Sequence, residues 1–162
     1  MEYPHILIPV DGSKESAFAC KLAVELTDSI PGQETIHLVH CLDPIPNLIG
    51  GEDRAALEKD NRKKANDLFA PYIERFNEIG NPCTTHIIYD ARPGRGIAQA
   101  AEEMKCNMII MGTRGIGAIK SALLGSVSRD VLEYAEVPVL LVRDGKGSEI
   151  FTKSKIVDTG KS

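Results

Sequence analysis

The sequence lacks the two features that direct a small domain to nucleic acid or to a membrane, an excess of positive charge and a long apolar run. Its 19 lysine and arginine residues are outnumbered by 23 aspartate and glutamate residues, and the net charge is -4 at pH 7. Nucleic-acid binding needs a basic face, and no apolar run approaches the ~20 residues of a transmembrane helix. The start, Met1-Glu-Tyr-Pro-His5, also lacks the regions of a signal peptide. We therefore expect a cytoplasmic protein without nucleic-acid or membrane partners.

The sequence also lacks a clustered set of metal or redox ligands. The four cysteines are widely spread, at Cys20, Cys41, Cys83 and Cys106. The absence of a Cys-x-x-Cys pair argues against zinc binding and thioredoxin-like chemistry, so we expect reduced thiols in or near the core. His37 and His40 are three residues apart on an expected strand, where their side chains face opposite sides and are poorly placed to share a metal ion.

Apolar segments typical of strands alternate with amphipathic segments typical of helices along the 162 residues, a length that suits one domain with a core. The expected strands cover residues 4–10, 34–41, 84–89, 107–111 and 137–142. The expected helices lie between them, at about residues 13–28, 53–79, 92–105 and 126–135. This alternation predicts an α/β fold in which helices cover both faces of a parallel sheet.

The first two expected helices carry local detail. Ser13 or Ser16 can cap the first helix, and its apolar stripe is formed by Ala19, Leu22, Ala23 and Leu26. The stripe of the second helix is formed by Ala65, Leu68, Phe69, Tyr72, Ile73 and Phe76. Pro71 lies inside this second pattern and predicts a kink or a break there, because proline has no backbone N–H to donate within a helix.

The most informative stretch follows the fourth expected strand. The run Met108-Ile-Ile-Met-Gly112-Thr-Arg-Gly115 is followed, nine residues later, by Gly125-Ser126-Val127-Ser128. Glycines at such turns let the backbone come close to a ligand. The second cluster opens a helical pattern, and the N–H groups at a helix start attract anions; Ser126 and Ser128 add hydroxyl donors. The stretch predicts a phosphate cradle, although its spacing differs from those of the common phosphate loop and the dinucleotide fingerprint.

The spacing Gly-x2-Gly-x9-Gly-Ser closely resembles the ATP-binding signature of the universal stress protein family. Three strand motifs agree in order and separation: Ile6-Leu-Ile-Pro-Val-Asp11-Gly-Ser13, Ile36-His-Leu-Val-His40 and Val137-Pro-Val-Leu-Leu-Val142. The resemblance covers residues 2–143. It implies a five-stranded parallel sheet of order 3-2-1-4-5 with helices on both faces, a Rossmann-type fold of the adenine nucleotide alpha hydrolase-like kind. Residues 1–143 would then form the universal stress protein domain, and residues 144–162 a C-terminal extension.

The resemblance also implies a ligand, ATP or another adenine nucleotide, with magnesium as a possible companion. In the family, the positions that match Pro9, Val10 and Asp11 contact the nucleoside, and the backbone at the position of Val39 meets the adenine. Met111 would pack on the ribose or the base edge. The expected phosphate cradle then consists of Gly112, Arg114, Gly115, Gly125, Ser126, Val127 and Ser128.

Several of these residues have a purely structural interpretation too. Asp11 can bind the ribose or a magnesium ion, or it can simply close the turn at Gly12. Arg114 can reach a phosphate or remain a solvated loop residue. Val39 can be a core residue and still present its backbone to the base.

Three functional hypotheses follow. The first is an ATP-binding regulatory protein of the stress response. The second is an enzyme that slowly hydrolyses ATP or transfers its phosphate. The third is a dimeric interaction module whose nucleotide site is vestigial. Hydrolysis needs a positioned base beside the γ-phosphate, and no residue stands out for that role, so we expect no catalytic residue and at most slow ATPase activity.

The last expected strand predicts an assembly. Every position from Val137 to Val142 is apolar, and a long apolar edge strand left open invites association. The resemblance implies a homodimer in which strand 137–142 pairs antiparallel with its copy, and a regulatory role implies a further protein partner. We expect the polar tail at 144–162 to lie against the partner subunit or its own sheet.

Overall fold

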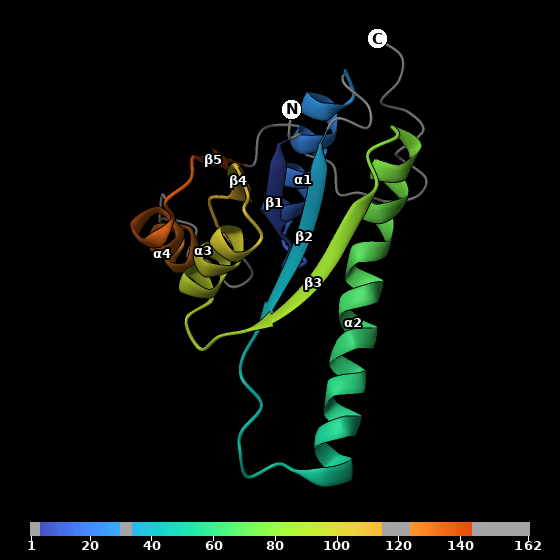
Figure 1. Cartoon of the computed structure of the whole chain (residues 1–162), viewed down its shortest axis with the longest axis vertical. Coiled ribbons are helices and arrows are strands. Elements are labelled where there is room, and N and C mark those ends of the chain that lie inside the picture. Colours follow the sequence, from blue (N-terminus) through green and yellow to red (C-terminus); the bar gives the residue numbers. More distant parts are fainter. Residues whose placement is uncertain (1–3, 30–33, 115–123, 144–162) are drawn as a thin grey trace.

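The computed structural model describes residues 4–29, 34–114 and 124–143. Five strands alternate with four helices in these ranges (Figure 1). The strands are β1 (His5–Pro9), β2 (Thr35–Leu42), β3 (Cys83–Tyr89), β4 (Met108–Gly112) and β5 (Val139–Val142). The helices are α1 (Lys14–Thr27), α2 (Gly51–Glu78), α3 (Pro93–Glu103) and α4 (Ser126–Tyr134). The expected boundary after residue 143 stays a prediction, because the tail 144–162 falls outside the described residues.

The strands form one parallel sheet in the order β3-β2-β1-β4-β5. This confirms the fold class and the strand order predicted from the sequence. β5 begins at Val139 rather than at residue 137. Pro138 has no N–H to offer to a ladder, and it contributes only its carbonyl, which accepts a hydrogen bond from the N–H of Ile109 at 2.9 Å.

Helices cover the sheet on both faces and enclose two apolar layers. On one face, α1 and α2 pack against strand residues that include Ile8, Leu38 and Ile110. On the other face, α3 and α4 pack against residues that include Leu7 and Ile109. Figure 1 shows α3 and α4 together beside β4, with α2 on the far side of β3. β1 and β4 lie side by side although their crossover helices leave on opposite faces, which is the topological switch point where ligands bind in such sheets.

Two details of the helices differ from the sequence prediction. Leu26 is 51% exposed and does not belong to the apolar stripe of α1. The buried face of α1 is lined instead by small residues such as Ala23 and Cys20, because the helix lies close to the sheet. α2 runs through Pro71 without the break that was one of the two predicted outcomes; a kink there stays a prediction. The buried Phe69 and Tyr72 on either side of the proline anchor the helix to the sheet, and this packing overrides the local preference for a break.

The cysteines behave as the sequence predicts. All four are free thiols in the structure, and Cys20 and Cys106 are buried. Burial raises the pKa of the Cys83 and Cys106 thiols to about 11, so both stay protonated and unreactive at neutral pH. Within the described ranges, no helix is both long and apolar enough to cross a membrane.

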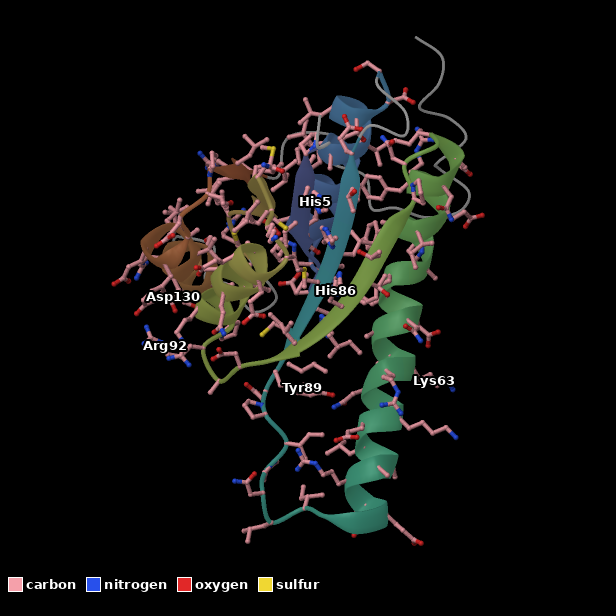
Figure 2. All side chains as sticks on the ribbon, viewed as in Figure 1. His5, Lys63, His86, Tyr89, Arg92 and Asp130 are labelled. Carbon is pink, nitrogen blue, oxygen red and sulfur yellow. The ribbon has the colours of Figure 1, made fainter. Side chains whose placement is uncertain are left out.

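Gly94 allows α3 and α4 to pack closely, and its replacement by alanine is expected to lower the free energy of unfolding by about 2 kcal/mol. A Cβ there would lie 2.4 Å from the Cβ of Asp130 and 2.7 Å from the carbonyl oxygen of Val127, a backbone atom that cannot move alone. Figure 2 shows Asp130 on α4, facing the start of α3. Urea denaturation measures the change. Gly50→Ala is the steric control, because a Cβ at Gly50 meets nothing within 4 Å; as Gly50 is the N-cap of α2, the change should cost no more than the ~1 kcal/mol typical of a cap substitution.

Candidate functional site

The candidate site begins with one row of residues across three neighbouring strands. The register pairs Pro9 of β1 with Val39 of β2. On the other side, Leu7 pairs with Ile109, and the same register places Met111 of β4 beside Pro9. Pro9, Val39 and Met111 therefore stand side by side at the carboxyl edge of the sheet. The structure thus brings together these three residues, which lie far apart in the sequence, at the edge where parallel sheets bind ligands.

Hydrogen bonds from β2 fix the backbone where β1 ends. The N–H of Val10 donates to the carbonyl of Val39 at 2.8 Å. The Nδ1–H of His40 donates to the carbonyl of Val10 at 2.7 Å, and the His40 ring stands edge-on to Phe69 with centroids 6.4 Å apart. His40 is therefore a positioning residue for this edge. The sequence alone shows His40 only as a strand-end histidine, because its partner is thirty residues away.

Asp11 closes the turn that links β1 to α1. Its Oδ1 accepts a hydrogen bond from the N–H of Ser13 at 2.9 Å, and the hydroxyl oxygen of Ser13 in turn accepts one from the N–H of Ser16 at 3.1 Å. Of the two N-cap candidates from the sequence, Ser13 and Ser16, the structure selects Ser13. The structural interpretation of Asp11 is confirmed, and its contact with a ribose or a magnesium ion stays a prediction.

Gly112, at the end of β4, lies directly on the first turn of α1. A Cβ at this position would be 2.5 Å from the Cβ of Glu15 and 2.9 Å from its carbonyl carbon. The close approach that this glycine permits is therefore to α1, and this contact alone explains why a glycine is needed. The approach of Gly112 to a ligand, the role expected from the sequence, stays a prediction.

Hydrogen bonds to the backbone of Thr113 join the end of β4 to the start of α4, and we call this set of bonds the clasp. The carbonyl of Thr113 accepts hydrogen bonds from the N–H of Gly125 and from the hydroxyl of Ser128, both at 2.7 Å. The N–H of Thr113 donates to the carbonyl of Val142 on β5 at 3.0 Å. The described part of the first glycine cluster, at residues 112–114, is thereby held to the second cluster, at residues 125–128. Thr113 was not among the predicted site residues, although it is the residue that holds the clasp.

The clasp also changes the role expected of Ser128. Its side chain is 1% exposed, and its hydroxyl is directed at the carbonyls of Thr113 and Gly125. The hydroxyl therefore stabilises the clasp instead of donating to a phosphate, which corrects that part of the prediction. Ser126, the first residue of α4, is exposed, and Val127 packs partly into the core.

The start of α4 remains suited to an anion. Gly125 is the N-cap and has no side chain to accept a hydrogen bond from the first turn. In an α-helix the first N–H groups have no partner within the helix, and the dipole adds a partial positive charge. The N–H groups of residues 126–128 occupy this position. Gly115, the remaining predicted residue of the cradle, lies outside the described residues.

Arg114 follows Thr113 and forms an ion pair at the edge of the site. Its Nη2 lies 3.1 Å from Oε1 of Glu15, and the two side chains are 26% and 12% exposed. The interpretation of Arg114 as a freely solvated loop residue is therefore wrong. Nothing in the sequence pattern marks Glu15 as its partner, since the two residues meet only through the contact of β4 with α1.

A row of three histidines crosses β1, β2 and β3 diagonally. Nδ1 of His5 lies 3.0 Å from Nε2 of His37, and Nδ1 of His37 lies 3.1 Å from Nε2 of His86. The hydroxyl of Thr84 is 2.9 Å from His37 and 3.1 Å from His86. Figure 2 labels the outer two, His5 on β1 and His86 on β3. In each neighbouring pair, Nδ1 of one ring faces Nε2 of the next, as in a hydrogen bond. The described residues contain no group of three or more ligands that could hold a metal ion.

This row predicts a loss of stability in weak acid. Burial, together with the neighbouring histidines, lowers the pKa of His37, and burial lowers the pKa of His86. The unfolded chain, with histidine pKa values near 6.5, then binds protons before the folded chain does. The free energy of unfolding should therefore be highest above about pH 6.5 and fall as the pH is lowered towards about 5.5, by at most ~1.4 kcal/mol per pH unit and proton.

Urea denaturation at pH 7.5, 6.5 and 5.5 measures this dependence. The variant His37→Gln/His86→Gln should show a flatter profile across the same range, above the pH at which carboxylates titrate. Equal slopes in the variant and the original chain would show that these histidines do not couple protonation to folding.

Comparison with known proteins agrees with this architecture. A model of the universal stress protein family matches residues 2–143. The chain belongs to the universal stress protein family. It is 34% identical over 138 residues to a universal stress protein of Thermus aquaticus, a match that covers 85% of this chain and 97% of the relative.

Solved universal stress proteins share the fold. One from Arabidopsis thaliana, with AMP bound, has a TM-score of 0.65 and 20% identity, over 88% of this chain and 92% of that chain. One from Archaeoglobus fulgidus, in complex with dAMP, has a TM-score of 0.58 and 22% identity, over 88% of this chain and 99% of that chain. Universal stress proteins of this fold therefore include members that bind adenine nucleotides.

Proposed function

We propose that this universal stress protein is a regulatory protein of the stress response that binds ATP, or another adenine nucleotide, between β1 and β4. The observation that carries the proposal is the clasp at Thr113. It holds the uncapped start of α4 against the end of β4, one strand away from Asp11 at the end of β1. In this proposal, the start of α4 binds the phosphates, and the neighbouring ends of β1 and β4 receive the nucleoside.

The proposed binding mode follows from this arrangement. The side chains of Val39 and Met111 are buried in the core, so the base and ribose lie at the carboxyl end of the row formed with Pro9, where the backbone of Val39 meets the base. Asp11 contacts the ribose or a magnesium ion. The phosphates lie at the N–H groups of residues 126–128, with Arg114 nearby; Gly115, which belongs to the same predicted cradle, lies outside the described residues. Val10 supports this edge through its bonds to Val39 and His40. The AMP and dAMP found in solved relatives support an adenine nucleotide as the ligand.

Calorimetric titration with ATP, AMP and GTP tests the proposal. We expect saturable binding of both adenine nucleotides and weaker binding of GTP. Adenine has an amino donor at position 6, whereas guanine has a carbonyl acceptor at that position, so a site that suits one base pairs poorly with the other. Absence of adenine-nucleotide binding at millimolar concentration would favour the hypothesis of an interaction module with a vestigial site. Against that hypothesis stand the three glycines and the serine of the signature, all of which this chain retains.

ATP turnover is expected to be very slow or absent, because the acid and base groups near the site are already engaged. His40 is bonded to the Val10 carbonyl, Glu15 is paired with Arg114, and Asp11 closes its turn. His86 lies on β3, which β2 and β1 separate from β4. Among the described residues, none is therefore placed as a general base for water beside the phosphates. A coupled assay for ADP release measures the rate, and steady turnover of several per second would favour the enzyme hypothesis.

A further inference from the structure

The ion pair of Glu15 and Arg114 adjoins the proposed phosphate site, because Arg114 is the next residue in the sequence after Thr113. Thr113, which accepts the hydrogen bond of the Gly125 N–H, directly precedes Arg114. Glu15 comes from the other side, on the first turn of α1, and its stem packs under Gly112. Its side chain is only 12% exposed, so its charge is less screened by solvent than that of a surface carboxylate.

The pair is electrically neutral as a unit, and this limits what Arg114 can offer to a phosphate. The guanidinium carries the positive charge that would attract the ligand, but the carboxylate 3.1 Å away already accepts from it. A phosphate group would have to share or displace that contact. It would also approach the negative charge of Glu15, and like charges at short distance in a partly buried site repel strongly.

We propose that Glu15 is a specificity-determining residue of this site, which competes with nucleotide phosphates for Arg114 and so limits the preference for highly phosphorylated ligands. The inference rests on the proposed nucleotide site and deepens it. Nucleotide affinity then depends on two opposed charges. Glu15 lowers the affinity for ATP more than that for AMP, and it leaves adenosine, which has no phosphate, nearly unaffected.

A double-mutant cycle tests this role, with binding of ATP, AMP and adenosine measured by calorimetry. Glu15→Gln keeps the side-chain stem that packs under Gly112 and removes only the charge. We expect ATP affinity to rise about tenfold, AMP affinity to rise less, and adenosine affinity to change by less than twofold. Arg114→Gln leaves Glu15 charged and unpaired, and should lower ATP affinity about tenfold. If Glu15 acts by holding Arg114, Glu15→Gln should change ATP affinity much less in the Arg114→Gln background than in the original chain, so the double variant should stay close to Arg114→Gln; strictly additive effects would refute the competition.

Two controls separate this role from a structural one. Glu25→Gln makes the same change at an exposed position of α1 and should leave the ratio of ATP to adenosine affinity unchanged. The effect of Glu15→Gln should also shrink as the ionic strength rises from about 0.05 M to 0.5 M, because salt screens charge.

The outcomes distinguish the inference from the proposed function. If the original chain binds ATP but Glu15→Gln leaves the ratio of ATP to adenosine affinity unchanged or lower, the role of Glu15 is refuted and the nucleotide site stands. If Glu15→Gln does not fold, Arg114→Gln decides alone, and an unchanged ratio there refutes the competition. If the original chain binds no adenine nucleotide at all, both proposals fall together.

Discussion

Replacement of Gly125 with valine is expected to weaken ATP binding by well over tenfold, more than ~1.4 kcal/mol. Gly125 is the N-cap of α4, with φ -71° and ψ 165°, values that valine also adopts. The backbone and its bond to Thr113 can therefore persist, while the new side chain fills the space through which a phosphate reaches the helix start. Calorimetry with ATP measures the loss.

Gly50→Val is the matched control for this substitution. Gly50 is also an N-cap glycine, that of α2, and a Cβ there meets nothing within 4 Å. This variant should bind ATP as tightly as the original chain. Unchanged ATP affinity in Gly125→Val would remove the start of α4 from the proposed site.

Replacement of Leu140 with lysine is expected to convert a homodimer into monomers or to make the protein insoluble. β5 is an edge strand that pairs with β4 on one side, and Leu140 is 36% exposed on it. An apolar edge strand is a template for pairing with another chain. We propose that β5 pairs antiparallel with its copy across a two-fold axis, which would satisfy both edges at once. A lysine there would place two charges close together in the interface.

Light scattering at micromolar concentration measures the assembly. Leu48→Lys provides the control, because Leu48 is an apolar residue that is 99% exposed in the loop between β2 and α2, far in the sequence from β5. It should leave the mass of the assembly unchanged. A monomeric original chain would contradict the proposed dimer, whatever the nucleotide site does. The protein partner expected for signalling and the cytoplasmic location stay predictions.

The arrangement of the fold could be predicted from the sequence because its signals are local or repeat along the chain. Apolar runs mark each strand, Ser13 caps α1 as expected, and the stripe centred on Phe69 and Phe76 is buried. The errors arise where tertiary packing outweighs local preference. Leu26 fits the helical period but lies outside the contact of α1 with the sheet, and Pro71 is accommodated because its neighbours are anchored.

The contacts around the candidate site could be predicted only in part for the same reason. Sequence spacing identified the two glycine clusters, and the structure brings them together at Thr113. It could not identify Glu15, which meets Arg114 only because β4 packs on the first turn of α1. Nor could it assign the hydroxyl of Ser128 to the clasp. Each of these contacts joins residues that are distant in the sequence, and no local pattern encodes such a pair.

The most direct test of the nucleotide site is the mass of any nucleotide released when the purified protein is denatured. We expect ATP or another adenine nucleotide from the original chain, or its stoichiometric uptake when ATP is added before a desalting step. Gly125→Val, purified in parallel, should release far less. An original chain that releases no adenine nucleotide, and retains none after incubation with millimolar ATP, would contradict the proposal that this protein is an ATP-binding regulator.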